Sequence, residues 1–323
     1  MNKKLNDLLT VFIFFSLLSF LPYNIFPQSI SKEVAITIDD LPVVTISRDF
    51  QTEVEITENL LKSITENKIP VTGFVIGDKL YKEGELDSNK VNLIKMWLDT
   101  GLELGNHTFT HPSLNNTSLD DYKKEVIRCD DILKEVLAAY KKKPEYLRQP
   151  YLQFGKDAKK IKDYYQFLED QSYKMAPVTI DNSDWIFARA FEKAYLDNDS
   201  LSMNKIAKAY IPYMKSKFEY YKKQSEKLFG YEIKQILLIH ASRLNADYIG
   251  DLIKMIRNSG YKIISLRDAL TDKAYEHKDN YLGNAGISWL HRWALTEGKK
   301  KDFFKGEPLT PEFVKKIAGI KHE

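Results

Sequence analysis

The sequence has almost no cysteine, since Cys129 is the single one among 323 residues. One cysteine cannot form an internal disulfide, so a disulfide framework is excluded. Cys129 lies within the amphipathic helical pattern DDYKKEVIRCDDILKEVL. We therefore expect it to be a buried small hydrophobe and not a nucleophile.

The sequence also lacks any long block of one charge, any internal repeat and any low-complexity tract. Lys and Arg number 48 and Asp and Glu number 45, giving a formal net charge of +3 with both signs interspersed. This pattern predicts neither nucleic acid nor a strongly anionic molecule as a partner, and it leaves the oligomeric state open. A chain of 323 residues that is 43% hydrophobic suffices for one barrel-sized catalytic domain with insertions.

Long apolar runs are rare, and the one near the start of the chain is typical of a targeting segment. Lys3 and Lys4 precede an apolar stretch from residue 8 to about residue 21. A charged region followed by an apolar region of this length predicts a signal peptide within residues 1–30, and hence export to the periplasm, the cell surface or the medium. No small-x-small cleavage site stands out, so an uncleaved N-terminal membrane anchor is the alternative.

Beyond that segment, short β-rich runs alternate with amphipathic helical patterns. Seven runs have the composition of strands: VAITID, VTGFVIG, LELGNHT, EYLRQP, YKMAPVTI, QILLIH and YKIISL. Helical patterns separate them, for example after Ser118, where Asp121 completes a capping pattern. This alternation predicts an α/β fold with a parallel sheet and crossover helices.

Carboxylate and imidazole side chains follow two of the predicted strands. Asp39 and Asp40 come at the end of one strand, and His107 and His111 follow another. Because the carboxyl ends of parallel strands meet at one rim of a barrel, we expect these side chains to converge. One carboxylate and two imidazoles, which we expect on one side of a helical turn, suit a divalent metal, zinc first and then cobalt, nickel or manganese. Adjacent Asp residues at a strand end can also be turn or capping residues.

Five short motifs, in order along the chain, resemble those of the polysaccharide deacetylases, carbohydrate esterase family 4. They are TIDD at 37–40, HTFTHP at 107–112, RQPY at 148–151, DNSDW at 181–185 and LLIH at 237–240. The resemblance covers roughly residues 34–270, and any single motif would be far less specific. It implies a distorted, incomplete (β/α)7 barrel that acts as a metal-dependent hydrolase.

The resemblance also implies a catalytic role for residues of every motif. The general base would be Asp39 and the general acid His240. Arg148 would pair with Asp39, since an opposite charge nearby lowers the pKa of a carboxylate. One carboxylate of DNSDW, Asp181 in preference to Asp184, would hydrogen-bond His240 and keep its ring protonated. The implied metal ligands are Asp40, His107 and His111.

Further motif residues would shape the substrate pocket. The main-chain N–H of Tyr151 would donate a hydrogen bond to the developing oxyanion, where one donor typically stabilises the transition state by roughly 3 kcal/mol. The ring of Tyr151 would line the sugar pocket. Trp185, together with Leu238 or Leu237, would close the apolar side of an acetyl pocket. Without the motif context, Arg148 could simply cap a loop and Trp185 could be an ordinary core residue. His240, at the edge of an apolar run, could be a core histidine.

One position departs from the family pattern. The first motif of the family usually continues with Gly, whereas this chain continues with Leu41 and Pro42. Because Pro fixes φ and removes a donor, we expect the loop beyond the metal to run differently and to change substrate access. The predicted activity is N-acetyl removal from N-acetylhexosamine units of an acetylated glycan such as peptidoglycan or a chitin-like polymer. An O-acetyl esterase, a small cyclic amide hydrolase and a non-catalytic carbohydrate-binding barrel stay open.

Two segments extend the predicted barrel, which we assign to residues 31–275. Residues 186–234, between the fourth and fifth motifs, exceed one crossover helix and keep helical periodicity, with Pro212 expected at a helix start or a kink. We expect a helical insertion, either a helix pair packed on the barrel or a cover over the substrate groove. Residues 276–323 are rich in aromatic side chains and are expected to pack onto the barrel.

Overall fold

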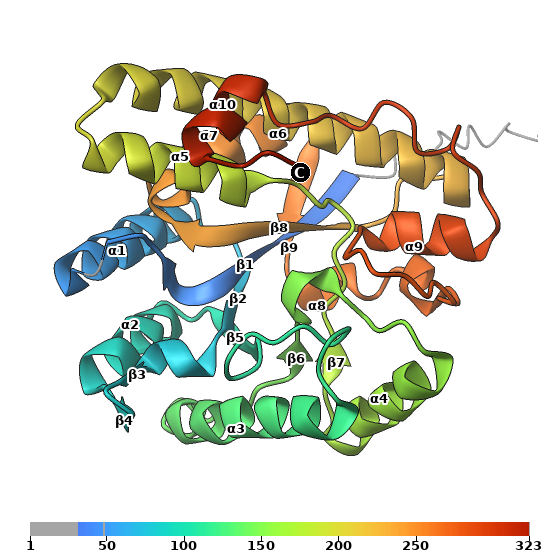
Figure 1. The fold of residues 1–323 in the computed structure, drawn as a ribbon, viewed down its shortest axis with the longest axis horizontal. Helices are drawn as coiled ribbons and strands as arrows, with labels where there is room; N and C mark the ends of the chain where they lie inside the picture. The colour runs from blue at the N-terminus through green and yellow to red at the C-terminus, as the bar shows by residue number, and fades with distance from the viewer. Residues whose placement is uncertain (1–31, 48, 323) are drawn as a thin grey trace, which may run out of the picture. The chain divides into compact units, whose positions relative to one another are not determined.

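The computed structural model describes residues 32–47 and 49–322. The predicted signal segment, residues 1–30, lies outside the described residues. Seven parallel strands form one sheet, which Figure 1 shows between two groups of helices. The strands are β1 (Lys32–Val44), β2 (Val71–Val75), β5 (Glu103–Asn106), β6 (Tyr146–Leu147), β7 (Lys174–Met175), β8 (Gln235–Ser242) and β9 (Tyr261–Ile264).

The sheet curls round toward itself, and its strand order places β1 between β2 and β8. The hydrogen-bonded order is β7-β6-β5-β2-β1-β8, and β9 pairs with the first residues of β1. A single parallel bridge between Ile180 and Leu237 joins the segment after β7 back to β8. The result is the expected distorted, incomplete (β/α)7 barrel.

The strand composition follows from burial on both faces. Residues 34–39 of β1 and all of β2 are buried, as parallel strands covered by helices require. Close packing explains two glycines of the sheet, one in β2 and one in β5. A Cβ at Gly73 would lie 2.7 Å from Leu41 Cδ2, and one at Gly105 would lie 2.5 Å from Phe74 Cε1. Glycine at these positions therefore leaves room for the side chains of Leu41 and Phe74 to pack directly against the backbone of the sheet.

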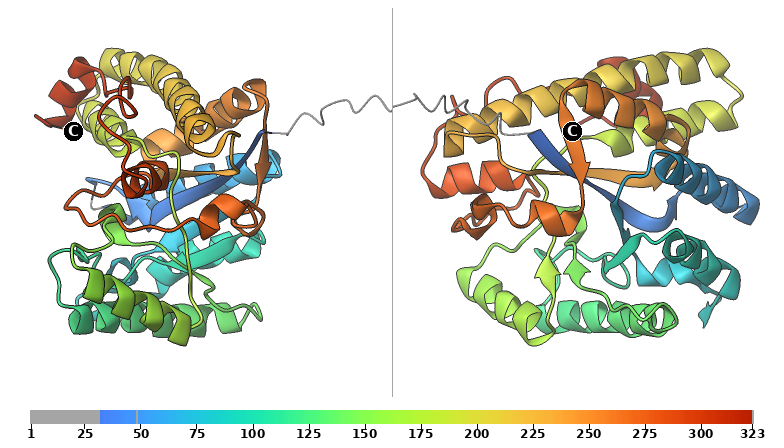
Figure 2. Two further views of the ribbon diagram at one scale, coloured as in Figure 1. Left: turned by 90° about the vertical axis from the view of Figure 1, so that its right-hand side faces the viewer. Right: turned by 180° about the vertical axis from the view of Figure 1, so that it is seen from behind.

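Helices connect successive strands and cover the outside of the barrel, as the two further views in Figure 2 show. Ser118 caps the helix after the second motif, where the Asp121 N–H donates to Ser118 Oγ at 3.2 Å, as the capping pattern predicts. Cys129, on the same helix, is buried, which confirms its expected structural role. The connecting helices are α1 (Phe50–Glu66), α2 (Ser88–Asp99), α3 (Leu119–Ala138), α4 (Ala158–Asp170) and α7 (Arg243–Asn258).

The range between the fourth and fifth motifs is a helix pair. It consists of α5 (Asp184–Leu196) and the long α6 (Ser200–Phe229), which contact each other and α7. Pro212 lies inside α6 and not at a helix start. In Figure 1, α6 runs along one side of the barrel, above β8 in that view.

The last residues pack onto the barrel through short helices. The Trp289 N–H donates to the Val178 carbonyl at 2.8 Å, and Ser288 Oγ donates to the Thr179 carbonyl at 2.7 Å. Both contacts anchor the tail to the segment between β7 and the fourth motif. The short helices near the end of the chain are α8 (Leu266–Ala269), α9 (Trp289–Thr296) and α10 (Glu312–Ala318), with a 3-10 turn at Lys273–Glu276. Elsewhere, 3-10 turns occur at Gly77–Leu80 and Pro150–Leu152, and β3 (Tyr81–Lys82) and β4 (Glu85–Leu86) form a small hairpin. Within the described ranges, none of the helices combines the length and apolarity needed to span a bilayer.

Candidate metal centre and active site

Asp40, which lies in β1 at its register shift, converges with His107 and His111, which follow β5. Asp40 Oδ1 lies 3.3 Å from His107 Nε2 and 3.5 Å from His111 Nε2. One ligand atom from each residue falls within 4.8 Å of the others. The three side chains therefore lie close together as expected, although β1 does not end at Asp40 but continues to Val44.

The donor set fits a divalent cation. The Arg148 carbonyl is 2.8 Å from His107 Nδ1. Since a carbonyl can only accept, Nδ1 carries the proton and Nε2 presents a lone pair to Asp40. Asp40 Oδ1 is buried and has no hydrogen-bond partner. The lone pair of His107 Nε2 and this carboxylate oxygen therefore face each other, an arrangement that a cation bound between them would stabilise.

The charge states of these ligands suit metal binding as well. Burial, together with nearby His107, lowers the pKa of His111 from 6.5 to about 3, so its imidazole stays neutral. Burial acts to raise the pKa of Asp40, but contact with His107 and the charge of Lys79 outweigh it and hold that pKa well below its usual value. The site therefore offers an ionised carboxylate and a neutral imidazole across the working pH range.

The helical turn expected for the two His residues is absent. Residues 107–113 form an irregular segment with no helix. Thr108 and His111 have positive φ values, 68° and 59°. Asp40 and Tyr151 share this left-handed conformation, with φ of 67° and 60°. Because non-glycine residues rarely adopt it, the surrounding structure must hold these backbones in place, as is common at functional sites.

Asp39 forms the expected ion pair with Arg148. Arg148 Nη1 donates to both carboxylate oxygens of Asp39 at 3.1 Å, and both side chains are buried. The other guanidinium donors are also used, since Nη2 reaches Thr37 Oγ1 at 2.9 Å and Nε reaches the Ala176 carbonyl at 2.6 Å. The first motif thus orients Arg148 through Thr37, and Arg148 orients Asp39.

His240 is held by Asp184, and the expectation that Asp181 makes this contact is wrong. Asp184 Oδ1 accepts from His240 Nδ1 at 2.8 Å, and Oδ2 accepts from the His240 backbone N–H at 2.8 Å. Burial lowers the pKa of His240, but the Asp184 carboxylate outweighs it and raises that pKa from 6.5 to about 9. The ring is therefore protonated at neutral pH. Asp184 is placed for this contact because it begins α5, beside β8.

The contact between Asp184 and His240 has further partners that the motifs did not reveal. Asn245 Nδ2 donates to Asp184 Oδ2 at 2.9 Å and to the His240 carbonyl at 2.8 Å. Tyr210, on α6, donates to Asn245 Oδ1 at 2.7 Å. Both residues lie outside the motifs, so only the packing of α6 and α7 brings them here.

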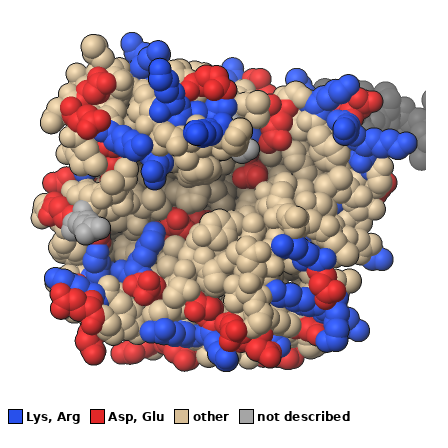
Figure 3. All heavy atoms as spheres, in the orientation of Figure 1, with Lys and Arg blue, Asp and Glu red and all other residues tan. Residues whose placement is uncertain are grey.

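Asp40, His107 and His111, together with Asp39 and His240, border one cavity of about 850 Å³. The ring of Tyr151 contacts that of His111 at 4.6 Å between centroids and is 58% exposed, and Trp185 is 42% exposed. Leu238 lines the cavity, whereas Leu237 does not. Figure 3 shows the corresponding face hollowed near its middle, with acidic side chains visible in the recess. Besides Trp185, the lining residues that come from the helix pair and the tail are Arg189, Lys217, Ala285, Gly286, Ile287, Glu307, Leu309 and Ile320.

The chain beyond Asp40 continues as a strand, and does not form the kind of loop that a glycine after the first motif would allow. β1 continues to Val44 through a register shift, and Leu41 turns into the apolar core. Lys79 Nζ donates to the carbonyls of Asp40 and Val43, at 2.8 and 2.9 Å. Leu41 thus supports the sheet, and the side chain that reaches the cavity from this stretch is that of Val44.

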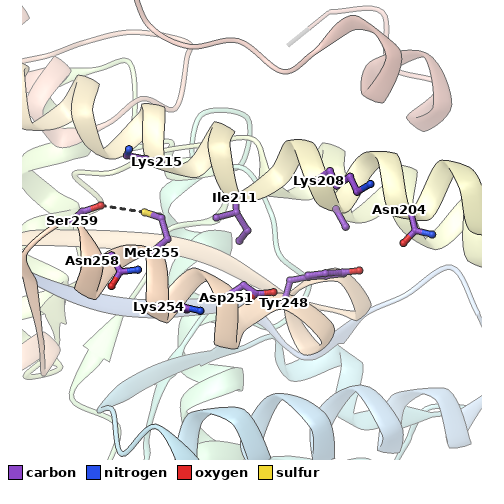
Figure 4. Close-up of a pocket in the computed structure, with 11 residues that line it drawn as sticks. Asn204, Lys208, Ile211, Lys215, Tyr248, Asp251, Lys254, Met255, Asn258 and Ser259 are labelled. Atoms are coloured by element: carbon purple, nitrogen blue, oxygen red, sulfur yellow. Dashed lines mark hydrogen bonds between the residues drawn. The ribbon is translucent and has the colours of Figure 1, made fainter.

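A second groove, of about 630 Å³, lies between α6 and α7 and is drawn in Figure 4. Its wall mixes Lys215, Lys254 and Asp251 with the apolar side chains of Ile211 and Met255. None of its lining residues belongs to the five motifs or to the cavity described above. The groove therefore supplies no metal ligand, base or acid to the site at the strand ends.

Comparison with known proteins gives a consistent result. Residues 28–167 match the family model of polysaccharide deacetylases. The chain is 26% identical over 164 residues to a peptidoglycan-N-acetylglucosamine deacetylase from Bacillus cereus, which covers 51% of this chain and 48% of the relative. It is 30% identical over 95 residues to a chitooligosaccharide deacetylase from Bradyrhizobium sp., which covers 29% of this chain and 39% of the relative. The chain thus spans less than half the length of each relative.

A solved structure supports the fold. It is a mutant of a CE4 family pseudoenzyme with restored enzymatic activity, from Bacillus anthracis, and it matches with a TM-score of 0.50 at 18% identity. The match covers 74% of this chain and 68% of that one. At this identity the likeness concerns the barrel alone.

Proposed function

Since this chain carries a polysaccharide deacetylase domain, we propose that it is a metal-dependent hydrolase that removes N-acetyl groups from N-acetylhexosamine units of a glycan. One observation carries the proposal. A metal-ligand triad, an ion-paired carboxylate and a protonated imidazole border the same cavity. Each of these groups has a separate task in amide hydrolysis.

Asp40, His107 and His111 would hold the cation, and zinc fits this donor set best, followed by cobalt, nickel or manganese. A bound cation supplies Lewis-acid polarisation of an acyl oxygen and makes a water molecule more acidic. The orientation of His107 by the Arg148 carbonyl keeps Nε2 free for this role.

The protein groups would move the protons. Asp39, held in place by Arg148, accepts a proton from the attacking water as the new C–O bond forms. The main-chain N–H of Tyr151 donates to the oxyanion. His240 then donates its proton to the nitrogen as the C–N bond breaks, and Asp184 keeps that ring charged and oriented. The products are acetate and a free amino sugar.

We propose an acetylated glycan of the cell envelope as the substrate. Relatives that act on peptidoglycan and on chitooligosaccharides support this class. The charged and apolar pattern of residues 1–30 supports export, by a cleaved signal peptide or an uncleaved anchor. An ester-linked acetyl group could use the same groups, so O-acetylated glycans belong in the substrate panel.

The fold alone would not argue for turnover, because a similar barrel belongs to a pseudoenzyme. The complete set of ligand, base and acid side chains favours an enzyme over a glycan-binding barrel. A small cyclic amide would be an alternative substrate for the same set, and a panel that includes one tests this directly.

The test measures acetate release by the zinc-loaded protein from oligomers of N-acetylglucosamine. Asp39→Asn keeps the contact with Arg148 but removes the base, and should lower kcat by about 10³-fold. His111→Ala should abolish both zinc retention and acetate release. His277→Ala is the matched control, because His277 contacts Glu297 and lies outside the cavity. Near-normal turnover in Asp39→Asn or His111→Ala would refute the assignment.

A further inference from the structure

The long helix α6 contacts the fourth motif through two tyrosine hydroxyls, one helical turn apart. Tyr213 Oη accepts from the Ser183 backbone N–H at 2.9 Å, directly before Asp184. Tyr210 Oη donates to Asn245 Oδ1 at 2.7 Å, and Asn245 Nδ2 donates to Asp184 Oδ2 at 2.9 Å. Both tyrosines lie outside the five motifs and outside the range that matches the family model. The helical insertion therefore reaches the carboxylate that holds the general acid.

The side-chain amide of Asn245 has its two ends fixed by different partners. Its Nδ2 donates to Asp184 Oδ2 and to the His240 carbonyl, and neither oxygen can donate in return. Its Oδ1 accepts from the Tyr210 hydroxyl at the opposite end. Burial and the nearby charge of Asp184 raise the pKa of Tyr210 well above its usual value, so this hydroxyl keeps its proton. The hydroxyl is thus a permanent donor to the amide.

Burial makes each of these contacts matter. Tyr210, Asn245 and Asp184 are all 0% exposed. A buried amide oxygen that loses its donor is destabilised, so removal of the Tyr210 hydroxyl favours a rotated amide or an added water molecule. Either change disturbs the donor to Asp184, and Asp184 makes both contacts that fix His240.

We propose that Tyr210 and Asn245 are positioning residues for the general acid, acting on His240 through Asp184. Neither side chain lines the cavity, so their effect on the reaction is indirect. The proposal rests on the proposed function, because that function gives His240 its task. It assigns the insertion a part in catalysis that is neither packing alone nor a cover over the substrate groove.

A purely structural role would make the Tyr210 hydroxyl an ordinary contact between helices. Tyr210→Phe separates the two roles, because the ring that contacts Phe187 at 5.5 Å between centroids is kept and only the donor is lost. Tyr220→Phe is the matched control on the same helix. Tyr220 is 6% exposed, donates to the Phe304 carbonyl at 3.0 Å and lies outside the cavity. Each variant loses one buried hydroxyl, so a general loss of stability should be similar in both.

The first experiment separates kcat from binding. Acetate release by the zinc-loaded full chain from a tetramer of N-acetylglucosamine gives kcat and KM, and calorimetry gives the Kd for zinc. Tyr210→Phe should lower kcat about fivefold to tenfold, the scale of one buried hydrogen bond, without changing KM or the Kd for zinc. Asn245→Asp places a second carboxylate against Asp184 and should lower kcat on the order of 10²-fold. Tyr220→Phe should match the wild-type protein in all three quantities.

The second experiment observes the ring of the general acid without turnover. Nitrogen NMR of the full chain with labelled histidine resolves Nδ1 of His240, whose resonance is assigned by its absence from His240→Gln. This atom donates to Asp184, so its resonance reports on that contact. The resonance should shift in Tyr210→Phe and stay in place in Tyr220→Phe.

The proposal would be overturned if kcat in Tyr210→Phe equalled that in Tyr220→Phe. A change in KM or in the Kd for zinc as large as the change in kcat would also overturn it, since the whole site would then have loosened. If the wild-type protein releases no acetate, the proposed function fails separately. The NMR comparison then decides, because a shift in Tyr210→Phe alone supports the positioning of His240 and equal resonances in both variants overturn it.

Discussion

Asp184 holds His240 at two points, through the ring Nδ1 and through the backbone N–H, each at 2.8 Å. The first contact sets the charge of the ring and the second fixes its position relative to α5. A residue that begins a helix thus controls the protonation of a residue on a neighbouring strand.

Asp184→Asn should narrow the pH range of activity. A general acid acts in its protonated form, so activity persists below the raised pKa of His240 and is lost as pH rises through it. Without the carboxylate, the alkaline limb of kcat/KM should move to lower pH by about 1–3 units. Asp181→Asn should move it less, because Asp181 does not hydrogen-bond the ring. An alkaline limb that stays in place in Asp184→Asn would contradict this account.

Lys79→Met should weaken metal binding. Lys79 Nζ holds the carbonyls of Asp40 and Val43, so its loss frees the backbone that presents the carboxylate ligand. Supporting contacts of this kind are typically worth about 10–100-fold in metal affinity, which zinc titration calorimetry would measure. The exposed Lys82→Met is the matched control. Equal affinities in the two variants would show that Lys79 does not position Asp40.

Gly286→Ala should lower kcat with little change in zinc affinity. A Cβ at Gly286 would lie 1.6 Å from the Tyr151 carbonyl oxygen, so the contact between the tail and the segment that presents the Tyr151 N–H must change. A displacement of about 1 Å can cost on the order of 10²-fold in rate. Gly250→Ala, on α7, meets nothing within 4 Å and should leave kcat unchanged. Steady-state kinetics of both variants would check the difference.

Asp39→Ala should destabilise the fold as well as stop catalysis. Arg148 is fully buried, and removal of its carboxylate partner leaves an uncompensated charge, which typically costs about 3–5 kcal/mol. Asp39→Asn should cost less, because an acceptor remains. Urea unfolding would measure both, and Asp39→Ala combined with Arg148→Met should recover part of the loss. Equal stability of Asp39→Ala and the wild-type protein would contradict the structural role of this pair.

The strands and the convergence of the motifs could be predicted because both follow from local patterns. Continuous apolar runs mark strands buried on two faces, and parallel strands place their carboxyl ends on one rim. The pairing of Asp39 with Arg148 followed from the motif resemblance, and the contact is present. The path of the segment after each strand was harder to predict, because it depends on packing against residues that are distant in the sequence.

The predictions that were wrong failed for this reason, since packing between distant parts of the chain decided the outcome. Spacing alone favoured a helical turn for His107 and His111, but Thr108 adopts a left-handed backbone that no residue type there signals. DNSDW offers two carboxylates, and the start of α5 decides that Asp184 faces His240. The tail residues of the cavity, such as Glu307, lie too far along the chain for any local pattern to connect them with the site.

The positions of the cavity-lining residues along the chain determine at what stage of protein synthesis the site can be complete. All five motifs have been synthesised by residue 240, whereas Gly286, Glu307 and Ile320 follow much later. Domains tend to fold from the N-terminus while the ribosome is still adding residues. A nascent chain that ends after β8 would therefore carry the proposed metal ligands before its binding pocket is complete, and the proposed hydrolysis would require the final helix, which packs on α5, to be in place.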